Sequence, residues 1–313
     1  MPPDTTTTTV TDRVARLNAA SLRKVIEPEA DVVGEVRAGR IVADELLSIN
    51  GMDVDLTPEQ RATLSREEIA AILDNGFRFE QILMAGFCLE LSMKDDLGDP
   101  RVAYALHEVG EETRHSRLFA RVVQQVGATA TNPLRGAGRI GRWIETRGNY
   151  ALITRPALLN TMILGGEEIP DLFQKLASEH PDTDPYLAAV SRYHRQEEAR
   201  HLSFARMQVS ERWKTATFSD RVAVRRVAPV LIREVFHSMV HPGVYASVGL
   251  PPWKTWLAVR KLPERIAIQQ RASRPVLDAL VAGGTFKPGR IPKGWQKLCG
   301  VDRHNRPLAA LPA

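Results

Sequence analysis

Four stretches with a helical pattern carry acidic residues among side chains that are otherwise apolar or small. Glu80 lies in FRFEQILMAGF, Glu112 in HEVGEETRHSRLF, Glu167 and Glu168 in MILGGEEIPDLF, and Glu198 in YHRQEEARHLSFAR. A carboxylate that faces the protein interior alone costs on the order of several kcal/mol to bury. The sequence therefore favours a helical fold that brings these carboxylates together around cations.

Two of the four stretches also contain the step Glu-x-x-His. Glu112 precedes His115 by three residues, and Glu198 precedes His201 by three. His194 lies one turn before Glu198. Steps of three and four place side chains on one face of a helix. We therefore expect each helix to present its Glu and His side chains toward the same neighbour.

Other acidic residues compete with the chosen ones for a place in this set: Glu90, Glu111 and Glu197. The three-residue step to the following His favours Glu112 and Glu198 over the acids beside them. Glu80 is favoured over Glu90 because it precedes Glu112 by about the length of a helix hairpin, whereas Glu90 lies too close.

This set of residue types is typical of a carboxylate-bridged centre of two metal ions in a helix bundle. Such a centre takes one Glu from each of two helices and a Glu-x-x-His step from each of the other two. Carboxylate and imidazole ligands suit iron or manganese. The only cysteines, Cys88 and Cys299, are too few for an iron–sulfur cluster or a Cys-rich zinc site. The sequence predicts two metal ions, with iron as the working metal and manganese possible in its place.

A third Glu-x-x-His step, Glu234 to His237 with His241 after it, tests how specific this pattern is. One such step is weak, since Glu and His also occur three apart on solvated helix faces. The third step lies outside the required order of helices, so we interpret it as structural. Near a helix C-terminus the two His side chains would favour the charged imidazole.

The chain has 313 residues and reads as almost entirely helical. Gly and Pro signals separate the expected helices, and residues 129–143 read as a loop or crossover. Capping boxes are expected at Thr57–Gln60 and Ser65–Glu68. The expected helices cover residues 65–96, 100–126, 155–180, 185–213, 220–241 and 263–282. Residues 1–25, with the Thr run Thr5–Thr9, are expected to be a disordered tail, 26–285 one helical domain, and 286–313 an extended C-terminal tail.

Composition excludes several other classes of protein. The net charge of +5 is spread along the chain, which gives no support to nucleic-acid binding. No run of 18 apolar residues is present, so we expect no membrane span. The N-terminal residues lack the pattern of a signal peptide, and the cytoplasm is the expected location.

The segment HRQEEARHLSFAR resembles the fourth-helix signature of the p-aminobenzoate N-oxygenase family of ferritin-like di-iron proteins. That family carries an extra His four residues before the second Glu-x-x-His, and His194 matches it. The spacing alone leaves Glu167 and Glu168 open, and the resemblance selects Glu167. It implies an all-α, ferritin-like four-helix bundle core with additional flanking helices.

The resemblance also implies a role for each ligand. Glu112 and Glu198 would bridge the two ions. The remaining ligands would divide between them, with Glu80 and His115 on one ion and Glu167, His194 and His201 on the other.

The activity implied by this resemblance is oxygenation of an arylamine nitrogen, with O₂ as co-substrate. Two ferrous ions can each give one electron to O₂. The chain shows no nucleotide-binding motif, so an external electron donor or reductase is expected. We also expect a small-molecule substrate and a homodimer. Arg271 and Arg274 could hold a substrate carboxylate, but a solvated helix face is the favoured explanation for both.

Three classes of function stay open at this level. One is an oxygenase that acts on nitrogen or carbon. Another is a ferritin-like ferroxidase or iron-binding protein, and the last is a metal-free helical scaffold.

Overall fold

The computed structural model describes residues 10–135 and 138–308, and this part of the chain is helical with no β-strand. The predicted all-α class is confirmed. The helices are α1 (Val10–Arg23), α2 (Pro28–Asp31), α3 (Pro58–Leu91), α4 (Pro100–Val126), α5 (Gly138–Ile153), α6 (Pro156–Glu179), α7 (Pro185–Thr215), α8 (Phe218–Val222), α9 (Ala228–Ser238), α10 (Pro242–Ala246), α11 (Pro252–Val259), α12 (Pro263–Ala282) and α13 (Lys293–Cys299).

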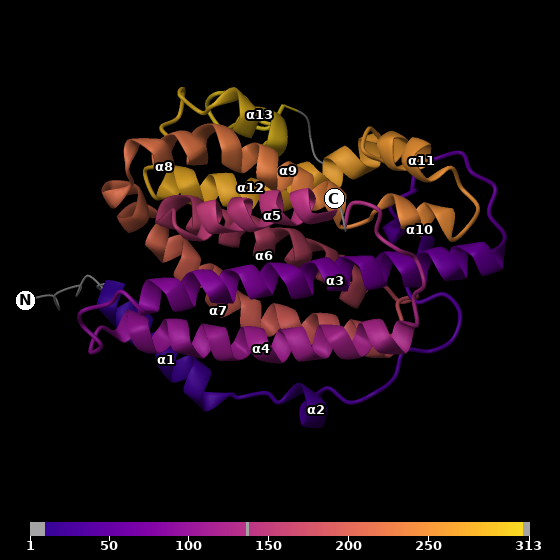
Figure 1. Ribbon diagram of the computed structural model, residues 1–313, viewed down its shortest axis with the longest axis horizontal. Coiled ribbons are helices and arrows are strands. Elements are labelled where there is room, and N and C mark those ends of the chain that lie inside the picture. Colours follow the sequence, from indigo (N-terminus) through magenta and orange to yellow (C-terminus); the bar gives the residue numbers. More distant parts are fainter. Residues whose placement is uncertain (1–9, 136–137, 309–313) are drawn as a thin grey trace, which may run out of the picture.

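The four longest helices form the bundle that positions the site. Helix α3 packs along α4, and α6 packs along α7 (Figure 1). Helices α9 and α12 pack against α6, and α1 covers α4. Because each long helix has neighbours on more than one side, the carboxylates inside the bundle are removed from solvent.

Local sequence explains where the bundle helices begin and end. Thr57 and Gln60 form the expected capping box at the start of α3. Asp99 and Asp184 cap α4 and α7, each followed by a Pro in the first turn. Gly127 ends α4 with a φ of 64°, a conformation in which a Cβ atom would be strained.

Three predictions about local structure are wrong. Ser65 does not cap a helix, because it lies inside α3, where its hydroxyl accepts a hydrogen bond from the Ile41 amide. Residues 138–143 of the expected loop belong to α5, which continues to Ile153. Residues 10–23 of the expected disordered tail form α1, which packs on α4. The Thr run at Thr5–Thr9 lies outside the described residues.

The C-terminal segment is part of the core instead of an extended tail. Phe286, Trp295 and Leu298 are buried with side chains of α6, α9 and α12. The Trp295 indole donates a hydrogen bond of 3.0 Å to the carbonyl of Val224. Gly and Pro in this segment mark its turns, but its apolar side chains supply packing that the bundle uses.

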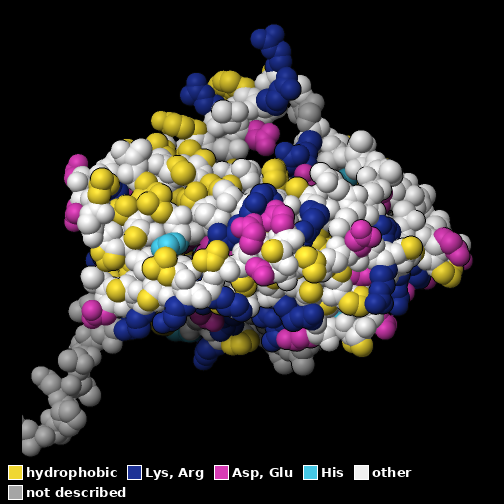
Figure 2. All heavy atoms as spheres, turned by 90° about the horizontal axis from the view of Figure 1, so that it is seen from below, with side chains coloured by type: hydrophobic (Ala, Val, Ile, Leu, Met, Phe, Trp, Pro, Cys, Tyr) yellow, Lys and Arg dark blue, Asp and Glu magenta, His cyan; other side chains and the backbone are white. Residues whose placement is uncertain are grey.

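The surface mixes both charges with scattered hydrophobic side chains. Figure 2 shows basic and acidic side chains interspersed over one face. Helix α5 has no buried residue and exposes Ile140, Trp143 and Ile144. Within the described part of the chain, no helix has both the length and the apolar character needed to cross a bilayer. The homodimer stays a prediction.

Candidate metal centre

The structure brings all seven predicted ligands together between α3, α4, α6 and α7. None of these side chains is more than 4% exposed. Helix α3 contributes Glu80, α4 contributes Glu112 and His115, α6 contributes Glu167, and α7 contributes His194, Glu198 and His201. The 3.6-residue period of each helix, which sequence reasoning used, points these residues into the bundle.

Two carboxylates and two imidazoles form the middle of the cluster. Nδ1 of His115 lies 3.1 Å from Glu112 Oε2 and 3.2 Å from Glu198 Oε1. Nδ1 of His201 lies 3.1 Å from Glu198 Oε2 and 3.2 Å from Glu112 Oε1. Each carboxylate therefore offers one oxygen to each imidazole, which is the arrangement needed for two carboxylates that bridge two ions.

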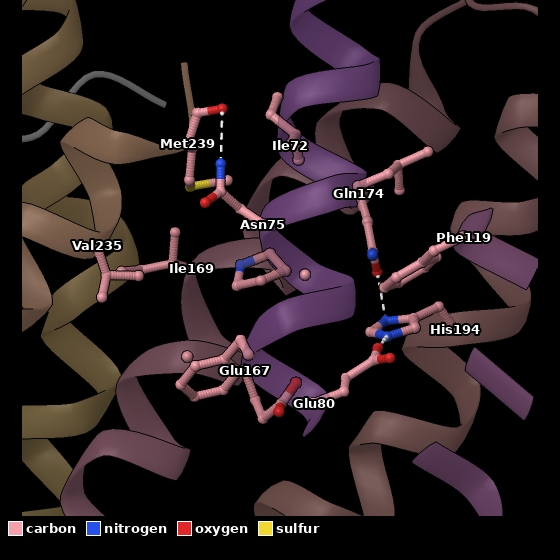
Figure 3. Close-up of a pocket in the computed structure, with 15 residues that line it drawn as sticks. Ile72, Asn75, Glu80, Phe119, Glu167, Ile169, Gln174, His194, Val235 and Met239 are labelled. Carbon is pink, nitrogen blue, oxygen red and sulfur yellow. Dashed lines mark hydrogen bonds and ion pairs between the residues drawn. The ribbon is translucent and has the colours of Figure 1, made fainter. Parts of the chain in front are cut away.

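His194 lies close to Glu80 and His115, whereas the resemblance implied that it shares an ion with Glu167 and His201. Its Nε2 lies 3.6 Å from Glu80 Oε1 (Figure 3), and its ring centroid lies 4.4 Å from that of His115. Ligand atoms of Glu80, His115 and His194 all fall within 4.8 Å of one another. His194 lies one helical turn before Glu198 on α7, and at this position its side chain reaches Glu80 on α3.

The structure separates Glu167 from its neighbour Glu168. Glu167 lines one cavity together with Glu80 and His194. Burial raises the pKa of Glu167, and the charges of Glu198 and Glu112 raise it further. Glu168 instead forms an ion pair with Arg206. The choice of Glu167, which rested on the resemblance, agrees with this placement.

The three acidic residues that were not chosen as ligands, Glu90, Glu111 and Glu197, lie at different places in the structure. Glu90 lies outside the cluster and pairs with Arg212 at 2.7 Å. Glu111 Oε2 lies 2.8 Å from Nε2 of His201, and Glu197 Oε2 lies 3.1 Å from Nε2 of His115. A carboxylate behind each imidazole orients the ring and makes it a stronger ligand.

The carboxylate behind each imidazole comes from the other helix: α4 supplies Glu111 to His201, and α7 supplies Glu197 to His115. The sequence analysis did not predict these contacts. Arg200 pairs with Glu111 at 2.8 Å and with Glu197 at 3.4 Å. Arg114 lies near the same two acids, at 3.9 and 3.7 Å. The signal was present in the sequence, because Glu-Glu-x-Arg-His occurs at residues 111–115 and again at 197–201.

His194 is oriented differently from the other two imidazoles. Its Nδ1 lies 2.9 Å from Gln174 Oε1 (Figure 3). Because an amide oxygen only accepts, Nδ1 carries the proton and Nε2 is free to bind a metal. Burial, with the nearby charge of His115, lowers the pKa of His194 to about 4. The ring is therefore neutral, as a metal ligand must be.

The electrostatics of the cluster call for bound cations. Burial alone would lower the pKa of His115, but hydrogen bonds to Glu112, Glu197 and Glu198 outweigh it and hold that pKa well above its usual value. Protons on the imidazoles thus stand in for the positive charge that the acids need. A bound metal ion would replace them.

The donor atoms fit a centre of two metal ions. Two buried carboxylate oxygens, Glu108 Oε2 and Glu167 Oε1, accept no hydrogen bond from the described part of the chain. Glu112 Oε1 and Glu198 Oε1 face only an imidazole nitrogen, each at 3.2 Å. Buried acceptors without donors are costly unless a cation binds them. Carboxylate oxygens with imidazole nitrogens are ligands that iron and manganese accept.

The third Glu-x-x-His step lies apart from the cluster. Glu234 pairs with Arg260 at 2.8 Å. Burial, with the nearby charges of Arg260 and Arg265, lowers the pKa of His237 to about 4. The structural interpretation agrees with this placement, but the expected charged imidazole is wrong, because burial and the nearby cations disfavour the charged form of His237.

Glu234→Gln and His237→Ala are therefore expected to leave the metal content at two ions per chain. Neither side chain contacts the cluster, so only local packing and the Arg260 ion pair change. Metal analysis after reconstitution with ferrous iron checks this. Loss of an ion from His237→Ala would move the centre toward residues 234–241.

Comparison with known proteins places the chain in a family. The family described as P-aminobenzoate N-oxygenase AurF matches residues 7–282, which is most of the chain. The chain belongs to this family. The family is one of di-iron oxygenases, and membership confirms the ferritin-like fold expected from the sequence.

Similar curated proteins carry no assigned activity. Uncharacterized protein Rv0885 of Mycobacterium tuberculosis and uncharacterized protein Mb0909 of Mycobacterium bovis are each 30% identical to the chain over 168 residues. The matched region is 53% of this chain and 48% of each relative, so it spans about half the length of either relative. No solved structure matches the chain.

Proposed function

We propose that this protein oxygenates the nitrogen of a neutral arylamine bound in a cavity beside the metal centre. The observation that carries this proposal is a cavity whose wall includes outer ligands of the metal centre. Glu80, Glu167 and His194 line one part of it (Figure 3). A small molecule in this space would lie next to the metal ions.

The lining of the cavity supports an aromatic and uncharged substrate. Most of its wall is apolar and includes the rings of Phe79 and Phe119 and the side chain of Ile169. Its amide side chains are Asn75 and Gln174, of which Gln174 is engaged with His194. No Lys or Arg of the described residues lines this cavity. An apolar wall without a cation binds a neutral ring better than a carboxylate.

The two arginines considered as carboxylate ligands lie elsewhere. Arg274 donates to Asp278 at 3.1 Å and to the carbonyl of Asn305 at 2.8 Å. Neither Arg271 nor Arg274 lines the cavity. These contacts support a structural role for Arg274 in holding the C-terminal segment.

The chemistry assigns separate roles to the metal and the chain. Bound iron would supply the electrons and the site for O₂. The chain shields the reaction from water and positions the amine. In the first oxygenation one oxygen atom forms a bond to nitrogen, and the other leaves as water after two electrons and two protons arrive from an external donor.

An assay with labelled oxygen tests this function. The full chain, loaded with ferrous iron and supplied with a chemical reductant and ¹⁸O₂, would receive 4-methoxyaniline, 4-aminobenzoate or 4-methoxytoluene separately. We expect ¹⁸O on the nitrogen of 4-methoxyaniline, and less product from 4-aminobenzoate because its carboxylate lacks a cation in the cavity.

The other outcomes separate the competing functions. Label on ring or methyl carbon alone would make the protein a carbon hydroxylase. Ferric iron that accumulates beyond two ions per chain, without organic product, would make it a ferroxidase. Faster reaction of 4-aminobenzoate would overturn the neutral substrate class and leave N-oxygenation standing.

A further inference from the structure

The two helices that carry Glu-x-x-His are related position by position. The α4 segment EVGEETRH, residues 108–115, aligns without gaps with the α7 segment HRQEEARH, residues 194–201. The reciprocal contacts of His115 with Glu197 and of His201 with Glu111 obey this alignment. Under the same alignment, the position equivalent to His194 is Glu108.

The structure places Glu108 in a position equivalent to that of His194. His194 shares a cluster with Glu80 and His115, and Glu108 shares a cluster with Glu112 and His201. In each cluster the ligand atoms lie within 4.8 Å of one another. The residue one turn before each bridging Glu thus reaches the imidazole of the other helix.

Among the described residues, no basic side chain pairs with Glu108 to explain its burial. The side chain is 1% exposed, and its Oε2 accepts no hydrogen bond from the described residues. No ion pair with Lys or Arg holds its carboxylate in the described part of the chain. A buried carboxylate oxygen that faces a metal site without a donor is a candidate ligand.

We propose that Glu108 is an eighth protein ligand of the di-iron centre. It would complete the half-site of Glu167 and His201, as His194 completes the half-site of Glu80 and His115. The two ions then differ in their donors. One has two imidazoles and one outer carboxylate, and the other has one imidazole and two outer carboxylates.

Substitution of Glu108 with measurement of metal binding tests this assignment. Apo full-length chain carrying Glu108→Leu would be titrated anaerobically with ferrous iron and followed by calorimetry and ⁵⁷Fe Mössbauer spectroscopy. We expect one tight ion to remain and the second to bind at least about 10–100-fold more weakly. Glu108→His should keep two ions and change one of the two iron signals, because it copies the His194 half-site.

Two comparisons separate ligand loss from misfolding. Glu68→Gln alters another buried acid of the bundle, one that accepts hydrogen bonds from Ser48 instead of facing the cluster, and should keep two ions. The thermal midpoint of apo Glu108→Leu should equal or exceed that of the wild type, because the variant removes a buried carboxyl without a partner.

The result that overturns the proposal is specific. If wild type and Glu108→Leu both bind two ions with the same affinity and the same Mössbauer spectrum, Glu108 is not a ligand, and the di-iron centre stands. If the wild type itself binds no iron, the metal centre fails together with Glu108.

Discussion

Glu198→Ala is expected to abolish tight binding of both metal ions instead of one. The two oxygens of Glu198 face different imidazoles, with Oε1 at 3.2 Å from His115 and Oε2 at 3.1 Å from His201. Removing one bridging carboxylate therefore takes a ligand from each ion. Loss of an outer contact to a metal ligand weakens binding about 10–100-fold, and loss of a direct ligand should be at least as large for each ion.

Metal analysis of the reconstituted variant, with circular dichroism to verify its helical content, measures this effect. Glu197→Ala is the matched comparison, because Glu197 is the adjacent residue and reaches the cluster through the far nitrogen of His115, at 3.1 Å. This variant should weaken the binding of one ion about 10–100-fold and leave the other ion bound. A Glu198→Ala variant that keeps one ion at wild-type affinity would show that Glu198 does not bridge.

His194→Ala is expected to empty the half-site of Glu80 and His115 while the other ion stays bound. The imidazole is neutral at physiological pH and presents Nε2 to Glu80 at 3.6 Å. Gln174 holds the ring from the opposite nitrogen. Binding of that ion should weaken at least about 10–100-fold. His180→Ala is the control, since His180 lies at the end of α6 and accepts from the Asp182 amide.

Double variants decide which ion His194 holds. Glu80→Ala with His194→Ala should still bind one ion, because both changes affect the same half-site. Glu167→Ala with His194→Ala should bind none. The reverse pattern in these two variants would return His194 to the ion of Glu167 and His201.

The sequence alone determined the helical class and most of the inward-facing donors. Both follow from the 3.6-residue period, which is a local property of the chain. Steps of three and four placed Glu112 with His115 and Glu198 with His201 on common faces, and the structure buries all four side chains. Caps such as Thr57 and Asp184 are equally local, since they satisfy amides within the next three residues.

The tertiary structure decided how these donors are shared between the two half-sites. Spacing along α7 could not show that His194 reaches Glu80 on α3, nor that Glu108 on α4 reaches His201 on α7. It also could not show that Phe286 and the residues after it pack into the core. Period and spacing set the face of a helix on which a residue lies. The neighbour that this face meets depends on how helices distant in the sequence pack together.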